Sequence, residues 1–168
     1  MTAMLILGVD PGLNRCGWGL VASEGSRLSH VAHGVIKPPP QQQLASRLHD
    51  LFEALSVVIE QYQPHEAAVE ETFVNSNARA ALALGQARGV ALAAAARRGL
   101  LVAEYAPTTI KKAVVGTGAA DKTQVAFMVR RLLPTAGDVT ADAADALGVA
   151  LCHAAHGGFK RRAGAQGT

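Results

Sequence analysis

Apolar positions along the chain fall into runs that predict five short strands. The first run, residues 4–9, is continuous and is typical of a strand that is covered on both faces. Two further strands are predicted at 17–22 and 28–36, and the short connections favour antiparallel pairing of these first three strands. The remaining two strands are predicted at 65–70 and 100–105.

Between these strands, apolar residues recur at intervals of three and four and predict helices. The stretch from Leu44 to Tyr62 has this spacing, and Pro64 shortly after it would end the helix. A long Ala-rich helix is predicted at 78–98, ending at Gly99. Three more helical segments are predicted near residues 107–114, 122–133 and 141–156.

This order of elements predicts an α/β fold, with a mixed five-stranded sheet flanked by helices on both faces. The chain has 168 residues, of which 49% are hydrophobic and 17% charged, so it can bury a substantial core and is not a disordered protein. We expect one domain over residues 1–157, followed by a basic, flexible tail at 158–168.

Charge, cysteine content and the longest apolar runs indicate which partners and which cellular location the protein could have. The formal net charge of +3 is mildly basic and compatible with an anionic partner. Cys16 and Cys152 are the only cysteines, too few for a disulfide framework or a zinc motif, which is typical of a cytoplasmic protein. No apolar run reaches the roughly 20 residues of a membrane span, and the N-terminus lacks the features of a signal peptide.

Acidic residues at the ends of predicted elements are the strongest chemical signal. Asp10 ends the first strand, and Glu70, with Glu71 beside it, ends the fourth. Asp142 and Asp145 are three residues apart and therefore share one face of the last helix. If the first and fourth strands are neighbours, a helix lying across their ends would bring four carboxylates together.

Carboxylates gathered within a few ångströms repel one another, which raises their pKa values unless a cation neutralises them. Their oxygens are hard ligands, which favours Mg²⁺ or Mn²⁺ over zinc. Two such ions roughly 3.5–4 Å apart can activate a water for an in-line phosphoryl displacement. The acidic pattern therefore predicts metal-dependent phosphoryl chemistry.

Each acid also has a plain structural interpretation. Asp10 precedes Pro-Gly and could shape a turn, and Glu70 could be a solvated residue at a strand end. Asp142 could cap the helix that begins after Thr140. Asp145 is harder to explain in this way, because it lies in a nearly uncharged helix where a buried carboxylate needs a partner. The conjunction of the four acids is a stronger signal than any one of them.

Aromatic and basic residues near these acids are candidates for binding a nucleic acid. Phe73 lies in the Asn-rich stretch FVNSNARA and could stack on an unpaired base or fill a gap in the core. Lys111 and Lys122 flank the Gly-rich segment VVGTGAAD, which lacks Walker A spacing but could bind a phosphate. Arg15 and Arg79 are further candidates for phosphate contacts, with surface ion pairs as the alternative.

Three other features have competing interpretations. Gly85 and Gly89 leave a smooth surface on the Ala-rich helix, which could pack on the sheet or against a second copy of the chain. His153 and His156 share a helix face without the second pair of ligands that a zinc site needs, so we interpret them as structural. Arg88 could contact a phosphate or form an ion pair.

Five sequence blocks, in order over about residues 4–156, resemble the RuvC family of Holliday-junction resolvases: GVDPG, VEETF, LGQARGVAL, KKAVVGTGAADKTQV and DAADALGVA. The resemblance implies a ribonuclease-H-like fold. It also implies a catalytic and metal-binding tetrad with two Mg²⁺ or Mn²⁺ ions in each active site. The tetrad would consist of Asp10, Glu70, Asp142 and Asp145.

The same resemblance implies a function. Members of the family cut four-way DNA junctions by paired symmetric nicks in recombination and repair, as homodimers alongside a RuvA/RuvB-type branch-migration complex. Phe73 would belong to the junction-recognition loop. Lys111 and Lys122 match basic positions near the active site, and Lys122 could stabilise charge in the transition state. We therefore expect a metal-dependent endodeoxyribonuclease in the cytoplasm, without membrane attachment.

Two alternatives belong to other functional classes. A junction-binding protein without nuclease activity would have no need of the four acids. An actin- or sugar-kinase-like nucleotide-binding domain also opens with a strand, an acid and a glycine. Such proteins need two domains of this kind around the nucleotide, and 168 residues supply one.

Overall fold

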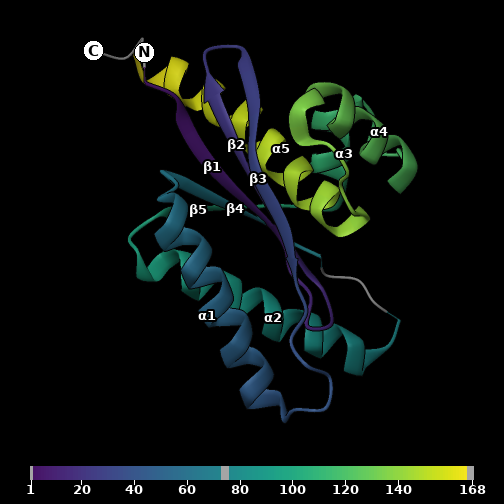
Figure 1. Cartoon of the computed structure of the whole chain (residues 1–168). Coiled ribbons are helices and arrows are strands. Elements are labelled where there is room, and N and C mark those ends of the chain that lie inside the picture. The colour runs from purple at the N-terminus through teal and green to yellow at the C-terminus, as the bar shows by residue number, and fades with distance from the viewer. Residues whose placement is uncertain (1, 73–75, 166–168) are drawn as a thin grey trace.

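The computed structural model describes residues 2–72 and 76–165, with side chains as far as residue 157. Five strands form one mixed sheet, in the order β3-β2-β1-β4-β5 (Figure 1). Strand β1 pairs antiparallel with β2 and parallel with β4, and the predicted mixed sheet is confirmed. The strands are β1 (Met4–Asp10), β2 (Cys16–Glu24), β3 (Arg27–Ile36), β4 (Glu66–Glu70) and β5 (Leu101–Tyr105).

Helices cover both faces of the sheet, as predicted. Two helices lie on one face of the sheet (Figure 1). On the other face, one long helix packs on the strands and two shorter helices pack against it. The first layer consists of α1 (Leu44–Tyr62) and α2 (Ala78–Arg97), and the second of α3 (Pro107–Val115), α4 (Lys122–Leu132) and α5 (Ala141–Ala165).

Two details of the helices differ from the prediction. A short 3₁₀ helix, η1 (Pro134–Ala136), separates α4 from α5 and was not predicted. Helix α5 continues to Ala165 instead of ending near residue 156. No helix in the described part of the chain is long and apolar enough to cross a membrane.

Strand β1 is the centre of the sheet and is buried on both sides. Ile6 belongs to the apolar core under α3, α4 and α5, whereas Leu7 and Val9 belong to the core under α1 and α2. This alternation follows from the two-residue period of a strand, and it explains why the run is continuously apolar. Because both faces of β1 are covered, polar side chains can reach solvent only at the ends of this strand.

Glycines allow α5 to lie directly on the sheet. A side-chain carbon at Gly8 in β1 would collide with the backbone oxygen of Ala146, and one at Gly17 in β2 would collide with that of Asp142. The helix backbone thus contacts the strand backbone at both points, which only glycine permits. This close approach fixes the first turns of α5 against the ends of β1 and β2.

A buried histidine ties α5 to the parallel strands. His153 is 4% exposed, and its Nδ1 and Nε2 lie 2.8 Å from the Tyr105 hydroxyl and 2.5 Å from a carboxylate oxygen of Glu66. Both ring nitrogens are therefore satisfied inside the protein, as buried polar groups require. Its role in these contacts is structural, in agreement with the sequence interpretation.

Both cysteines are free and buried, on opposite faces of the sheet. Cys16 lies in the core under α1 and α2, and Cys152 lies in the core under α5. The sheet itself separates them, so the two sulfurs cannot form a bond without a rearrangement of the fold.

Candidate active site

Two acids leave the sheet side by side at the carboxyl ends of β1 and β4. The strands are parallel neighbours, and Val9 pairs with Val69 in the last step of their register. Asp10 and Glu70 follow directly, so both carboxyl groups emerge at the same edge, as predicted from the sequence. The carboxyl groups of Asp10 and Glu70 are close enough to hydrogen-bond to each other.

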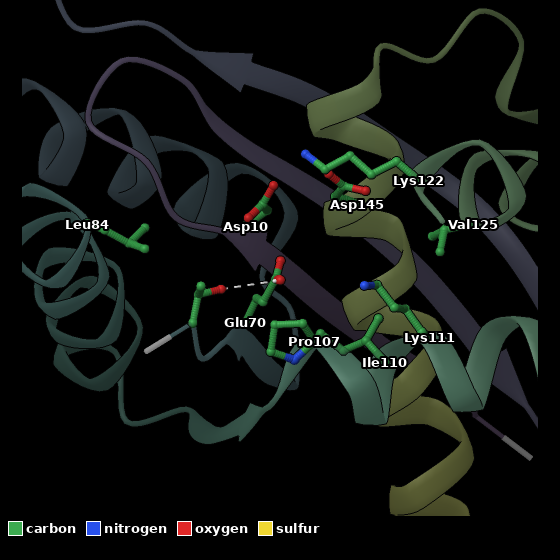
Figure 2. A pocket seen from close by; sticks show the side chains of 10 residues that line it. Asp10, Glu70, Leu84, Pro107, Ile110, Lys111, Lys122, Val125 and Asp145 are labelled. Carbon is green, nitrogen blue, oxygen red and sulfur yellow. Dashed lines mark hydrogen bonds between the residues drawn. The ribbon is translucent and has the colours of Figure 1, made fainter. Parts of the chain in front are cut away.

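A third acid, Asp145 of α5, enters the same cavity (Figure 2). Its carboxylate points from the second turn of the helix toward the ends of β1 and β4. The cavity has a volume of about 340 Å³ and combines these acids with two lysines and an apolar wall. Its lining residues are Asp10, Glu70, Thr72, Leu84, Pro107, Ile110, Lys111, Lys122, Val125 and Asp145.

Burial and neighbouring charges raise the pKa values of two of these acids. Burial, followed by the negative charge of Glu70 and a hydrogen bond with it, raises the pKa of Asp10 from 3.8 to about 9. Burial also raises the pKa of Asp145, to about 6, although the charge of Lys122 opposes this increase. Perturbation of neighbouring carboxyl groups in a cleft is typical of functional sites. With all three acids ionised, the cavity would carry more negative charge than its two lysines neutralise.

Two lysines supply the partial compensation from α3 and α4. Lys111 and Lys122 extend their amino groups over the acids in Figure 2, and both lower the pKa of Asp145. Lys122 is the first residue of α4, where Asp121 and Gln124 form a capping box with two 2.8 Å hydrogen bonds. Because Asp121 already accepts from the Gln124 amide, we assign any phosphate binding here to the lysine side chains.

The fourth predicted acid, Asp142, does not line this cavity. It is in the first turn of α5, where Thr140 provides a side-chain cap to the amide of Ala143 at 3.4 Å. Its carboxylate is 3.8 Å from the Arg15 guanidinium and lines a neighbouring cavity. It is nevertheless close enough to raise the pKa values of Asp10 and Asp145.

The residues present fit a divalent cation, although the described side chains are not arranged around one. Among the residues that the structure describes, no three His, Cys, Asp or Glu side chains form a group that could hold a metal ion as they stand. The donor set is nevertheless purely oxygen, and Mg²⁺ binds through few carboxylates while retaining several waters. A cation among Asp10, Glu70 and Asp145 would also remove the repulsion that raises the pKa of Asp10.

Other residues singled out in the sequence lie elsewhere. Arg88 lies 3.5 Å from Glu71 and 2.5 Å from Glu104, so the ion-pair interpretation of this arginine is the correct one. Glu71 is thereby held outside the cavity. Phe73 is outside the described residues. Arg15 and Arg79 line a second cavity, next to the first.

Sequence reasoning missed the uncharged members of the site. The hydroxyl of Thr72 donates to a carboxylate oxygen of Glu70 at 3.4 Å, and the apolar wall includes Leu84 and Ile110. The block VEETF contains Thr72 two residues after Glu70, so the threonine could have been considered. The apolar wall had no comparable signal, because apolar residues on α2 and α3 are expected in any amphipathic helix.

Comparison with known proteins gives concordant matches over nearly the whole chain. Residues 6–153 match the family described as Crossover junction endodeoxyribonuclease RuvC. A relative of that description from Caulobacter vibrioides is 63% identical over 149 residues, 89% of this chain and 88% of the relative. One from Hyphomonas neptunium is 55% identical and covers 98% of both chains. A solved structure of T. thermophilus RuvC in complex with a Holliday junction substrate has a TM-score of 0.87 at 33% identity, covering 94% of this chain and 96% of the other.

Proposed function

The chain belongs to the RuvC family of crossover junction endodeoxyribonucleases and has its ribonuclease-H-like fold, and from this premise we propose that the carboxylate cavity resolves Holliday junctions. One observation carries the assignment of the site. Three carboxylates and two lysines, from β1, β4, α5, α3 and α4, meet in one cavity of about 340 Å³. Convergence from five elements is hard to explain by surface solvation, which would scatter the charges.

The family consists of nucleases that require divalent metals, and we propose two Mg²⁺ or Mn²⁺ ions per active site. Asp10, Glu70 and Asp145 would hold them, and Asp142 would complete the ligand set after leaving Arg15. The ions would supply an activated water and charge stabilisation at the phosphate. The central position of Asp10, which interacts with Glu70, Asp142 and Asp145, suits a ligand shared by both ions.

The chain's own residues bind and orient the scissile phosphate. Lys111 and Lys122 oppose the acids across the cavity, so a phosphate between them would find a cation on one side and the acids on the other. Lys122 stabilises negative charge that develops on the phosphate oxygens. Leu84 and Ile110 form an apolar wall that limits access of bulk water and strengthens these interactions.

Contacts outside the cavity would hold the junction arms. We propose that Phe73 stacks on an unpaired base at the branch point, on the strength of the family resemblance alone. Arg15 and Arg79 are exposed and would contact phosphates. These contacts would fix the register of the DNA, whereas the acids would hold the metal ions that cleavage requires.

A homodimer would deliver two nicks with two-fold symmetry. Leu82 is 63% exposed on α2, and side-chain atoms added at Gly85 or Gly89 would meet nothing within 4 Å. This open face of α2 suits close approach of the same helix from a second copy. Gly89→Arg should yield a monomer by light scattering, whereas Val57→Arg on the exposed face of α1 should leave the dimer intact. A dimer that survives Gly89→Arg would contradict this interface.

Family membership also supports two broader proposals. The protein would act in the cytoplasm, in recombination and DNA repair, together with a RuvA/RuvB-type branch-migration complex. Addition of such a complex to a cleavage reaction on a mobile junction should increase the rate of resolution. An unchanged rate would argue that this protein works without it.

The deciding experiment compares labelled four-way junctions with a linear duplex and an RNA–DNA hybrid, in Mg²⁺ and in Mn²⁺. We expect paired symmetric nicks in the junctions only, with 5′-phosphate and 3′-hydroxyl ends. Asp10→Asn should bind the junction normally and fail to cut it, whereas Asp50→Asn on α1 should cut normally. Cleavage by Asp10→Asn at the wild-type rate would refute the site, and junction binding without cleavage by the wild type would favour the non-cleaving alternative.

A further inference from the structure

A second cavity, of about 620 Å³, adjoins the carboxylate cavity and shares Leu84 with it. We propose that it binds a backbone phosphate of the DNA strand next to the scissile one, with Arg47 as its anchor. This inference rests on the proposed nuclease function and adds a subsite to it. The lining residues are Gly12, Leu13, Asn14, Arg15, Arg47, Asn77, Arg79, Ala80, Ala83 and Leu84.

Arg47 is built into the wall of this cavity. It lies in the first turn of α1, and its half-buried side chain reaches back to the loop that follows β1. Its Nη2 donates to the backbone oxygen of Leu13 at 3.2 Å and to Oδ1 of Asn14 at 2.9 Å. The guanidinium is thereby held in one orientation, so little side-chain freedom remains to be lost on binding a ligand.

Part of the hydrogen-bonding capacity of Arg47 has no partner among the described residues. Its Nε is buried without a hydrogen-bond partner, and among the side chains that the structure describes no carboxylate pairs with the guanidinium. A half-buried cation that lacks an acidic partner leaves part of its charge uncompensated. A phosphate can accept from several guanidinium donors at once, which matches this unused capacity.

The other charges of the cavity have the same sign. Arg15 and Arg79 line it together with Arg47, and its described lining includes no acidic residue. Arg79 lies in the first turn of α2, a turn without acidic residues, where the helix dipole disfavours a cation. The amides of Arg79 and Ala80 are already bonded to Oδ1 of Asn77, so the side chains are the groups left to attract an anion. A bound phosphate would relieve the unfavourable charge at this helix end.

The position of this second cavity beside the carboxylate cavity favours a phosphate of the DNA backbone, and not a free anion, as its ligand. Leu84 separates it from the carboxylates, and Arg15 at its rim is the residue that pairs with Asp142. A strand whose scissile phosphate lies between the acids and lysines would therefore carry a neighbouring phosphate past Arg47. Arg47 would be a binding residue toward that phosphate and, through Leu13 and Asn14, a positioning residue for the loop after Asp10.

The test measures junction binding in EDTA, at several salt concentrations, by fluorescence anisotropy. Removing one phosphate contact should reduce the slope of log affinity against log salt by about 0.7–0.9. Arg47→Gln should show this reduction and roughly tenfold weaker binding at low salt. Arg47→Lys should retain the slope, because it keeps the charge. Arg27→Gln, at the hairpin of the opposite sheet end, is the matched removal of one exposed arginine.

The outcomes separate the subsite from the proposed function. If Arg47→Gln binds with the slope and affinity of Arg27→Gln, the phosphate subsite is wrong even when the wild type cuts junctions. If Arg47→Gln melts at a lower temperature with an unchanged slope, the residue is structural and the inference is also overturned. If the wild type binds with a salt slope that Arg47→Gln reduces, but does not cut in Mg²⁺ or Mn²⁺, the nuclease assignment fails and the subsite stands.

Discussion

Replacing Asp10 by Asn should stabilise the metal-free protein while abolishing cleavage. Burial and the charge of Glu70 raise the pKa of Asp10 from 3.8 to about 9, so near neutral pH the folded protein must take up a proton that the unfolded chain does not hold. Asn is nearly isosteric, carries no charge and can donate a hydrogen bond to Glu70 without proton uptake. The substitution therefore removes a cost of folding together with a proposed metal ligand.

The magnitude follows from the pKa difference. Each unit between 3.8 and an assay pH of 7.5 corresponds to about 1.36 kcal/mol, which sets an upper limit of about 5 kcal/mol. Asp10 is only half-buried, so water reduces the cost of its repulsion and burial. We therefore expect Asp10→Asn to raise the free energy of unfolding by about 1–3 kcal/mol. For a chain of 168 residues this corresponds to a rise in Tm of roughly 3–10 °C.

The effect should depend on pH in one direction. A pKa raised in the folded state gives a contribution to stability that is complete below pH 4 and is lost as the pH rises toward 9. The advantage of Asp10→Asn should therefore be small at pH 4–5 and larger at pH 8. Thermal unfolding in EDTA between these values measures it, with Asp50→Asn as the control.

Metal provides the second arm of the same assay. Mg²⁺ or Mn²⁺ should raise the Tm of the wild type more than that of Asp10→Asn, because a ligand that binds only the folded state stabilises it. An Asp10→Asn protein that is less stable than the wild type at pH 8 in EDTA would refute the repulsion argument. Equal stabilisation of both proteins by metal would refute the role of Asp10 as a ligand.

Three further substitutions test other parts of the structure. Gly8→Ala should lower the free energy of unfolding in urea by about 3 kcal/mol because its side chain collides with α5. Tyr105→Phe should cost about 1–2 kcal/mol in the same assay by leaving His153 short of a partner. Lys122→Met should lower kcat about 10²-fold with little change in junction affinity, and should move the acid limb of the pH–rate profile upward, since Lys122 lowers the pKa of Asp145. If Lys122→Met changed only the stability of the protein, the last prediction would be wrong. Unfolding curves of Gly8→Ala and Tyr105→Phe that match the wild type would contradict the other two.

The sequence was sufficient for the five strands, for the positions of the five α-helices and for placing Asp10 beside Glu70, but not for η1 or for the end of α5. The correct predictions follow from local periodicity together with one rule, since parallel neighbouring strands end at the same edge of a sheet. The family resemblance supplied the same acids independently. What local pattern could not supply was the path of α5 across the sheet. That path depends on Gly8 and Gly17, whose role is visible only when the two backbones meet.

Side-chain pairing was the other limit. Asp142 and Asp145 share a helix face, yet one pairs with Arg15 and the other enters the cavity, because a single turn of α5 separates two differently charged surroundings. Arg47 gave no signal in the sequence, since an arginine in the first turn of an amphipathic helix is ordinary. Its contacts to residues 13 and 14 arise from a loop more than 30 positions away.

The acids and the glycines are parts of one physical arrangement. Burial, together with the neighbouring carboxyl groups, raises the pKa of Asp10 to about 9, and these groups would separate if the elements carrying them could move apart. The backbone of α5 packs directly on Gly8 of β1 and Gly17 of β2. This close packing prevents the helix from moving away from the strand ends. The core on both faces therefore holds together charges that repel, and the cavity keeps an affinity for cations that a more relaxed arrangement would lose. The repulsion between these acids lowers the stability of the metal-free protein. The same repulsion favours binding of the divalent cation that the proposed cleavage requires.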